Sequence, residues 1–409
     1  MLKIVHLQAV LPSYGNAPYR LHEAMLKNGI DSSILAYNTP RAHSKNFYRF
    51  SGLKKLIKLQ LYGILQKYIV SQKKPNTHLF SYPFIIGNNV TNHPMVVNAD
   101  VIYLHWINGG FLSLKNIRQI LELGKPVVFF MHDMWTITGG CHYSFDCEGY
   151  KSNCELCPLF KDDNKLSYAS KEFKEKQALF SVFDNIYFIA PSKWSAECAK
   201  QSGLLVNKQI FHIPNIIDEQ LFKPFNKKTA KQILNINPEV KTIAFGCVAG
   251  IGNTIKGWSY LEKALNKIYL ENKELNIEIL IFGSDYNQAT VDALPYPIKF
   301  FGQLNDEISM VVLDNATDVF VSPSLAESFG LTSLENIMCG TPVVVFNNGG
   351  TIDFVEHKIN GYLANYKSSD DLAAGIIFCL ENKLSAPPPV HFYVKKSIQK
   401  HLDLITSIL

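Results

Sequence analysis

The chain has 409 residues, of which 47% are hydrophobic and 18% are charged. This length predicts two or three domains, and this composition is that of a globular protein rather than a disordered one. The 40 basic and 35 acidic residues leave a net charge of +5. That excess is too small for a dedicated nucleic-acid binder, so we expect no nucleic-acid partner. No run of about 18 apolar residues occurs, so the sequence predicts no transmembrane helix.

The N-terminal residues, MLKIVHLQAVLPSYG, are typical of a first strand and a glycine loop rather than of a signal peptide. No small-residue cleavage site follows the apolar stretch. We therefore expect a cytoplasmic protein whose cysteines are reduced unless a metal holds some of them.

The first half of the chain alternates predicted strands and helices. Residues 2–8 are typical of an apolar strand, and 17–28 carry apolar residues at helical spacing before Gly29, a residue that commonly ends a helix. This βαβ pattern builds parallel sheets. Further strands are predicted at 30–36, 98–104, 127–131, 186–190 and 208–213, with a helix at 113–122.

A second α/β series begins after Ile213-Pro214-Asn215. Strands are predicted at 242–248, 277–282, 298–301, 318–322 and 342–346, and helices at 258–270, 306–315, 331–339 and 370–381. The sequence therefore predicts two doubly wound, Rossmann-like α/β domains, 1–214 and 215–392. We expect the last helix, 393–409, to return to the first domain. Ligands of open parallel sheets bind at the carboxyl ends of the strands, so we expect both domains to face a central cleft.

The segment 323–353, PSLAESFGLTSLENIMCGTPVVVFNNGGTID, carries the most chemical information. It leaves a strand and enters a helix near Leu331, and the unpaired N–H groups of a helix start favour an anion. Glu327 and Glu335 flank this start. Carboxylates accept hydrogen bonds from hydroxyls, so a nucleotide sugar, which has hydroxyls on both sides of its diphosphate, suits the pattern. The alternative is that Glu327 only supports the helix start and Glu335 is an exposed helix residue.

Lys256 precedes Gly257 in the loop after strand 242–248. A lysine at the end of a strand can reach a diphosphate as a point charge. The alternative is a solvated loop lysine without a ligand.

The stretch from Glu327 to Asp353 strongly resembles the donor-site motif of the large retaining glycosyltransferase family 4, which has the GT-B fold. The resemblance includes the two glutamates, the Gly-Thr-Pro-Val-Val turn at 340–344, the Gly349-Gly350 pair and Asp353. Four other segments match further parts of the family pattern: Asn360-Gly361-Tyr362-Leu363, Ile213-Pro214-Asn215, Ala190-Pro191-Ser192 and Lys256-Gly257.

The resemblance implies a role for each matching residue. Glu335 would accept hydrogen bonds from the ribose hydroxyls, and Glu327 would contact hydroxyls of the donor sugar. Lys256 would neutralise charge on the leaving diphosphate, and His132 would lie near the donor sugar from the other domain. The other donor-binding residues are Ser328, Phe329, Gly330, Leu331, Thr332, Gly15 and Asn16. The family generally needs no metal for its chemistry, so we expect no catalytic cofactor.

Two positions depart from the family pattern. The family usually places an arginine a few residues before the lysine, but 249–255 contain none. The first loop usually carries paired glycines, whereas here Gly15 is followed by Asn16. Both departures concern the geometry of phosphate binding.

Four of the eight cysteines, Cys141, Cys147, Cys154 and Cys157, fall between 132 and 158. The last pair has the C-x-x-C spacing that is common among metal ligands, so a structural zinc site is one hypothesis. Two disulfides, or reduced thiols packed as small hydrophobic groups, are the alternatives. The same stretch resembles a subgroup of the family from polysaccharide gene clusters.

Residues 51–74 are predicted to form a basic amphipathic helix, with six lysines and no acidic residue. Such a helix is a candidate for binding an anionic membrane surface, as a peripheral protein on its inner face. The alternative is a helix that packs its apolar stripe on the core and leaves the lysines in water. The apolar stripe consists of Leu53, Leu56, Ile57, Leu61, Ile64, Leu65 and Tyr68.

The sequence thus predicts a retaining glycosyltransferase of the hexosyltransferase type. It would move a sugar from a nucleotide-diphosphate sugar, UDP before GDP, to a glycan or lipid-linked acceptor in surface polysaccharide synthesis. The alternatives are a nucleotide-sugar epimerase and a non-catalytic sugar-nucleotide-binding protein on the same scaffold.

Overall fold

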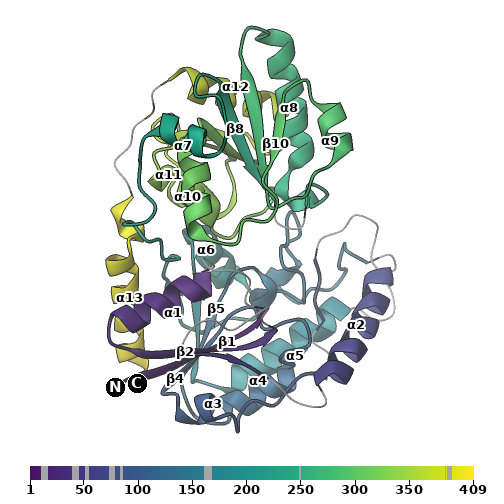
Figure 1. The fold of residues 1–409 in the computed structure, drawn as a ribbon. Coiled ribbons are helices and arrows are strands. Elements are labelled where there is room, and N and C mark those ends of the chain that lie inside the picture. Colours follow the sequence, from purple (N-terminus) through teal and green to yellow (C-terminus); the bar gives the residue numbers. More distant parts are fainter. Residues whose placement is uncertain are drawn as a thin grey trace. The chain divides into compact units, whose positions relative to one another are not determined.

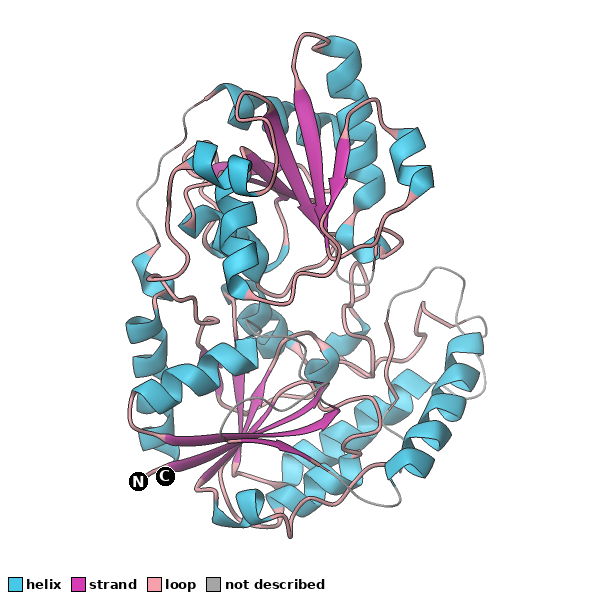
Figure 2. Cartoon of the chain, in the orientation of Figure 1, coloured by secondary structure: helices cyan, strands magenta, loops and turns pink. Residues whose placement is uncertain are grey.

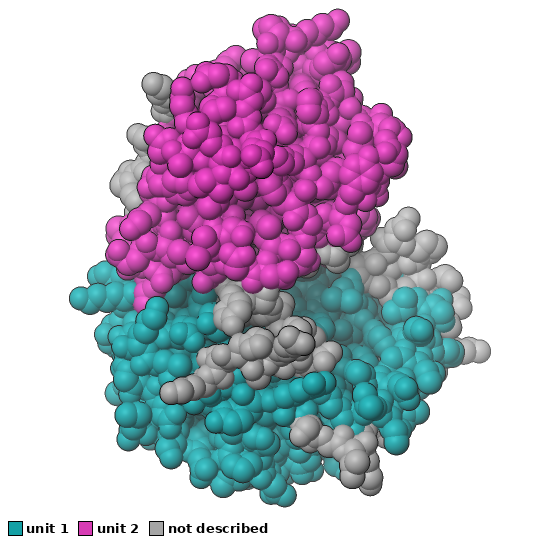
Figure 3. Space-filling view, viewed as in Figure 1, with its two compact units in different colours: residues 1–216, 395–409 teal, residues 217–394 magenta. Residues whose placement is uncertain are grey.

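Two parallel sheets, each flanked by helices, make up the chain in the computed structural model (Figures 1 and 2). The structure describes residues 1–10, 17–38, 46–50, 55–72, 79–82, 86–160, 168–247, 250–382, 384 and 389–409. The chain divides into two units, 1–216 with 395–409, and 217–394 (Figure 3). The predicted α/β fold class is confirmed, because every pair of neighbouring strands in both sheets runs parallel.

The first unit holds a seven-stranded sheet in the order β3-β2-β1-β4-β5-β6-β7. Its inner strands are apolar on both faces, as β4 with the sequence VIYL and β5 with VVFF show, because helices cover both sides of a parallel sheet. The strands are β1 (Lys3–Val10), β2 (Asp31–Asn38), β3 (Phe47–Arg49), β4 (Val101–Leu104), β5 (Val127–Phe130), β6 (Ile186–Ala190) and β7 (Ile210–His212).

The helices of the first unit come from both ends of the chain. Helix α13 belongs to this unit, and its His401 Nδ1 lies 3.2 Å from the Tyr103 hydroxyl of β4. The helices are α1 (Ala17–Lys27), α2 (Lys55–Gln72), α3 (Pro94–Asn98), α4 (Leu114–Leu121), α5 (Tyr168–Val182), α6 (Lys193–Gln201) and α13 (Val394–Ile408), with 3-10 turns at Trp135–Ile137 and Gly149–Lys151.

The second unit holds a six-stranded sheet in the order β10-β9-β8-β11-β12-β13. Its strands are β8 (Lys241–Gly246), β9 (Ile277–Phe282), β10 (Ile298–Phe300), β11 (Val319–Ser322), β12 (Val343–Phe346) and β13 (Gly361–Ala364). Its helices are α7 (Lys227–Ile233), α8 (Trp258–Glu271), α9 (Gln288–Ala293), α10 (Glu307–Ala316), α11 (Leu331–Met338) and α12 (Ser369–Glu381), with 3-10 turns at Thr254–Lys256, Gly349–Asp353 and Val390–Phe392.

Helix α2 is the described part of the basic helix predicted at 51–74; Lys54, Lys73, Lys74 and Leu53 lie outside the described residues. Its apolar stripe faces water, because Leu56, Ile57 and Ile64 are 70%, 59% and 64% exposed. The alternative in which this stripe packs on the core is therefore wrong.

The inward face of α2 is built from other residues. Tyr62 and Ile69 are buried, and Lys55 is also buried, with its ammonium donating to the carbonyl oxygens of Tyr37 and Phe50. Lys58 likewise donates to the carbonyl oxygen of Gly87 at 2.7 Å. These two ammonium groups pair with backbone carbonyls of the first unit, while the apolar side chains named above stay exposed.

Among the described residues, no helix combines the length and the apolar character needed to cross a membrane.

Candidate functional site

The loop after β11, Pro323 to Gly330, is fixed by backbone contacts with two neighbouring loops. Leu325 N donates to Ile255 O at 2.8 Å in the loop after β8. Gly350 N donates to Glu327 O at 2.8 Å in the loop after β12. Since β8, β11 and β12 are neighbours in a parallel sheet, their following loops meet at the carboxyl edge, where ligands of such sheets bind.

Two glycines make this close approach possible. Gly257 has φ +73°, and a Cβ atom there would lie 1.9 Å from Pro323 O. Gly330 has φ +90°, and a Cβ atom there would lie 2.4 Å from Thr351 Cγ2. Any other residue would be strained by the left-handed backbone and would collide with a neighbouring loop.

Lys256 and Glu327 form an ion pair across two of these loops. Lys256 Nζ lies 2.9 Å from Glu327 Oε2, and the two side chains are 29% and 18% exposed. The structure thus brings together the two residues that the sequence assigned to diphosphate and sugar. The lysine has a carboxylate partner, so the alternative of a simply solvated loop lysine does not describe it.

Helix α11 begins at this place without a side-chain cap. Gly330 occupies the capping position and offers no side chain, while Leu331 and Thr332 in the first turn are half-buried. The first N–H groups of the helix therefore have no capping side chain, and they carry the positive end of the helix dipole. Ser328 is buried, and Phe329 packs its ring against Phe354 and Phe392 with centroids 5.6 Å away in each case.

Glu335 lies on the buried side of α11 and is only 6% exposed. The alternative of an exposed helix residue is therefore wrong. Burial raises the pKa of the Cys339 thiol, and the negative charges of Asp314 and Glu335 raise it further.

In the first unit, His132 follows β5 and is half-buried. Its ring lies parallel to that of Phe130, with centroids 4.7 Å apart and an interplanar angle of 7°. Burial lowers the pKa of His132 to about 4, and the Asp133 carboxylate acts in the opposite direction, so the imidazole is neutral at pH 7. Gly15 and Asn16 of the first loop lie outside the described residues.

Several polar residues around His132 were missed from sequence. His105, directly after β4, places its Nδ1 2.8 Å from His132 Nε2. Asp133 Oδ2 lies 2.6 Å from His142 Nδ1, and His142 Nε2 lies 2.8 Å from Ser81 Oγ. Burial is the largest single influence and raises the pKa of Asp133, but the charge and hydrogen bond of His142, the backbone N–H of Trp135 and the charge of His132 together lower it, so the net shift is downward. In the sequence, the only signal for these polar residues is that His105 and Asp133 come just after apolar strands.

A buried ion pair anchors the loop that follows β5. Lys176 Nζ lies 2.7 Å from Glu172 Oε1, and neither side chain is exposed to water. The same ammonium donates to Trp135 O at 2.5 Å and Thr138 O at 3.1 Å. Helix α5 thereby fixes the backbone between His132 and the cysteines, and removal of either charge would leave the other buried and unpaired.

The four clustered cysteines line one cavity of about 20 Å³, together with Phe80, Gly139, Ser144, Tyr150, Glu155 and Ala169. All eight cysteines of the chain are thiols, so the disulfide alternative is not observed. Within the described part of the chain, no group of three or more His, Cys, Asp or Glu side chains is arranged to hold a metal ion. The structure therefore gives no support to the zinc hypothesis.

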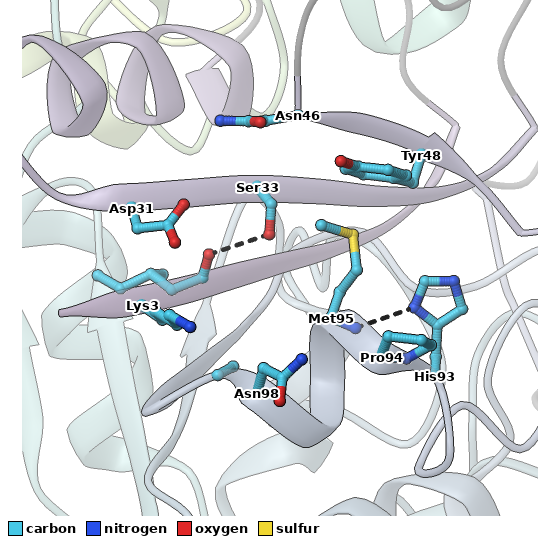
Figure 4. A pocket seen from close by; sticks show the side chains of 11 residues that line it. Lys3, Asp31, Ser33, Asn46, Tyr48, His93, Pro94, Met95 and Asn98 are labelled. Carbon is cyan, nitrogen blue, oxygen red and sulfur yellow. Dashed lines mark hydrogen bonds between the residues drawn. The ribbon is translucent and has the colours of Figure 1, made fainter. Parts of the chain in front are cut away.

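A larger cavity, of about 450 Å³, lies at the amino ends of the strands of the first sheet, whereas His132 lies at their carboxyl ends (Figure 4). It is lined by the first residues of β1 and β2, including Lys3 and Asp31, and by His93, Pro94 and Met95 at the start of α3. Ligands of open parallel sheets bind at the carboxyl ends of strands, and this cavity lies at the amino ends. We therefore place the candidate site at the carboxyl edge.

Comparisons with known proteins agree with this geometry. The profile of the group 1 glycosyl transferases matches residues 242–382, which include all the loops that contribute to the site of the second unit. An uncharacterised glycosyltransferase of Methanocaldococcus jannaschii is 35% identical over 301 residues, which are 67% of this chain and 71% of that protein. A D-inositol 3-phosphate glycosyltransferase of Mycobacterium marinum is 27% identical over 187 residues, 42% of this chain and 37% of that protein.

Solved structures show the same fold at low identity. An Anabaena protein in complex with UDP-glucose matches over the whole of both chains, with a TM-score of 0.63 and 17% identity. A glycosyltransferase involved in lipopolysaccharide biosynthesis matches over 98% of this chain and 95% of that one, with a TM-score of 0.60 and 15% identity.

We expect Gly257→Ala to lower the free energy of unfolding by at least about 1–2 kcal/mol, since the left-handed backbone alone has that cost for a residue with a Cβ atom. The collision with Pro323 O adds to it. Urea unfolding of the purified variant measures the change. Gly252→Ala is the matched control, because a Cβ atom there meets nothing within 4 Å. Equal stability of the two variants would contradict the close loop packing.

Proposed function

The chain belongs to the group 1 glycosyltransferases, the retaining enzymes of family 4 with the GT-B fold, and on this premise we propose a specific reaction for it. It moves a sugar from a nucleotide-diphosphate sugar, with UDP preferred over GDP, to a sugar hydroxyl of a glycan or lipid-linked acceptor in surface polysaccharide synthesis. The UDP-glucose bound to the Anabaena protein and the lipopolysaccharide role of another structural relative support this choice.

The observation that carries the proposal is the Lys256–Glu327 pair beside the start of α11. A diphosphate meets two positive groups here, the ammonium and the N-terminal end of the helix. A sugar meets Glu327, and a ribose meets the buried Glu335. We propose that the second unit binds the donor and the first unit receives the acceptor, with His132 directed at the donor sugar.

The chemistry proposed for this site relies on electrostatic stabilisation. No residue of the motifs is an evident covalent nucleophile on the far face of the sugar. The incoming hydroxyl therefore attacks on the same face from which the diphosphate leaves, and the leaving phosphate oxygen accepts its proton. Lys256 and the amides at the start of α11 stabilise the charge that develops on that phosphate. Enzymes of this family generally work without a metal.

One activity screen distinguishes a transferase from a nucleotide-sugar epimerase on the same scaffold. An epimerase converts a single nucleotide sugar without an acceptor, whereas a transferase without acceptor releases nucleoside diphosphate slowly by hydrolysis. Incubation of the protein with individual UDP- and GDP-sugars, followed by chromatography, identifies both the donor and the reaction. A binding protein without activity would leave every nucleotide sugar unchanged.

With the donor identified, we expect Lys256→Ala to lower turnover by about 100-fold or more, the usual cost of one lost group that stabilises a developing anion. Release of nucleoside diphosphate measures the rate. Lys228→Ala is the matched control, since Lys228 is an exposed lysine of the same unit paired with Glu239. Unchanged turnover of the Lys256 variant would remove this lysine from the mechanism.

We also propose that the enzyme works as a peripheral protein on the inner face of a membrane, through α2. Seven large apolar side chains of this helix are exposed, which is more than a soluble surface normally gathers on one helix. They are Leu56, Ile57, Leu61, Ile64, Leu65, Tyr68 and Val70. No acidic residue occurs between 51 and 74, so an anionic lipid surface meets no repulsion there. Such a surface would also present a lipid-linked acceptor.

The membrane proposal predicts retention of the protein on vesicles that contain anionic lipid at low salt. Leu56→Glu combined with Ile64→Glu is expected to abolish retention in a flotation assay, because both side chains are exposed on α2. Ile308→Glu is the control, since Ile308 is 69% exposed on α10 of the other unit. Failure of the unmodified protein to float with these vesicles would refute the proposal.

A structural zinc ion at Cys141, Cys147, Cys154 and Cys157 remains a proposal. The support for it lies in the sequence, in the clustering of these four cysteines and the C-x-x-C spacing of the last pair. Burial raises the pKa of Cys154 to about 12, so this thiol stays protonated without a cation.

The zinc proposal predicts about one zinc per chain in protein purified without chelator, measured by mass spectrometry of the metal. Cys141→Ser is expected to lower that content, whereas Cys379→Ser, on helix α12 of the other unit, is not. Far less than one zinc per unmodified chain would leave the alternative of packed thiols.

A further inference from the structure

Three imidazole rings form a hydrogen-bonded row across three neighbouring strands of the first sheet. His6 on β1 places Nδ1 2.9 Å from Nε2 of His105, which follows β4. His105 places Nδ1 2.8 Å from Nε2 of His132, which follows β5. Because β1, β4 and β5 are adjacent, this row leads from the interior of the sheet to its carboxyl edge.

All three rings are neutral at physiological pH. Burial lowers the pKa of His6 and His105 well below the usual value, and neighbouring histidines lower both further. A neutral imidazole has one N–H donor and one acceptor nitrogen. The row can therefore be ordered in only two ways. Either each ring donates toward His132, which then carries its proton on Nδ1, or each donates toward His6, which then carries its proton on Nε2.

The environment of His6 disfavours the second order. His6 Nε2 is buried and has no hydrogen-bond partner among the described residues. The neighbouring polar rings are those of His22, Tyr103 and His401, and they carry no negative charge. His22 Nδ1 is engaged with Ser32 Oγ, and His401 Nδ1 with the Tyr103 hydroxyl. A proton on His6 Nε2 would thus be a buried donor without an acceptor, and among the described residues no carboxylate near His6 compensates for it as Asp133 does at the other end of the row.

The environment of His132 favours the first order. Asp133 is a carboxylate with a lowered pKa, and its negative charge attracts the N–H end of the row. His132 Nδ1 makes no hydrogen bond to the described residues, and the parallel contact with Phe130 fixes the plane of the ring. His142 bonds Asp133 and does not join the row.

We infer that His6 and His105 are positioning residues that hold His132 as the Nδ1–H tautomer, so that His132 is a hydrogen-bond donor and not a base. Which nitrogen of a histidine carries the proton is set by the partner of the other nitrogen. The recipient of this hydrogen bond rests on the proposed function: it is an oxygen of the donor sugar. The tautomer itself does not depend on that function.

The test is a long-range ¹H–¹⁵N correlation spectrum of the full chain labelled in histidine, recorded without ligand at neutral pH. We expect His132 to show a protonated Nδ1 and an unprotonated Nε2, although Nε2–H is the more common form of free histidine. A protonated Nε2 on His132 in the unmodified protein would overturn the inference, whatever reaction the enzyme catalyses.

Variants of His105 separate positioning from mere packing. His105→Phe keeps a ring but offers no donor, so we expect the fraction of His132 in the Nδ1–H form to fall below one half. His105→Gln offers an amide N–H and is expected to restore it. His401→Phe, which removes a buried histidine outside the row, should leave the tautomer unchanged. An unchanged His132 spectrum in a folded His105→Phe variant would overturn the role of His105.

Discussion

Backbone-to-backbone packing around the loop after β11 is the constraint on which the candidate site of the second unit depends. The loops after β8 and β12 are hydrogen-bonded to it through Leu325 N and Gly350 N. Only glycine fits at Gly257 and Gly330, where neighbouring loops approach closely. Because the loop cannot shift, Glu327 and the start of α11 keep fixed positions relative to Lys256. The charges are arranged by the backbone before any ligand arrives.

Much of this arrangement could be predicted from sequence, for physical reasons that differ between elements. Fully apolar stretches such as VVFF at β5 can only be buried strands or helix segments, and glycine spacing marked the loops of the donor motif. The burial of Glu335 could not be predicted, because helical periodicity alone does not say what covers a charged residue. Helix α5 was missed because Glu172 and Lys176, which form a buried ion pair, lie at buried positions of its pattern.

The buried face of helix α2 is a second feature that the sequence pattern could not predict. The apolar spacing correctly indicated a helix, but the predicted amphipathic character is wrong, because apolar side chains lie on both its buried and its exposed face. Tyr62 and Ile69 pack inward together with the lysine stems, whose ammonium groups reach the backbone carbonyls of Tyr37 and Gly87. Those acceptors come from distant parts of the sequence. The histidine row could not be predicted for the same reason, since His6, His105 and His132 are neighbours only after β1, β4 and β5 pair.

The pairing of Lys256 with Glu327 also bears on selectivity among anions. The two charges neutralise each other, so a free phosphate that binds Lys256 must displace the carboxylate and leave it without a partner. On the function proposed above, a nucleotide sugar would replace both halves of the pair at once, with a diphosphate for the ammonium and hydroxyls for the carboxylate. With those roles, the ion pair would make abundant inorganic anions weak competitors, although they carry the same sign of charge as the diphosphate.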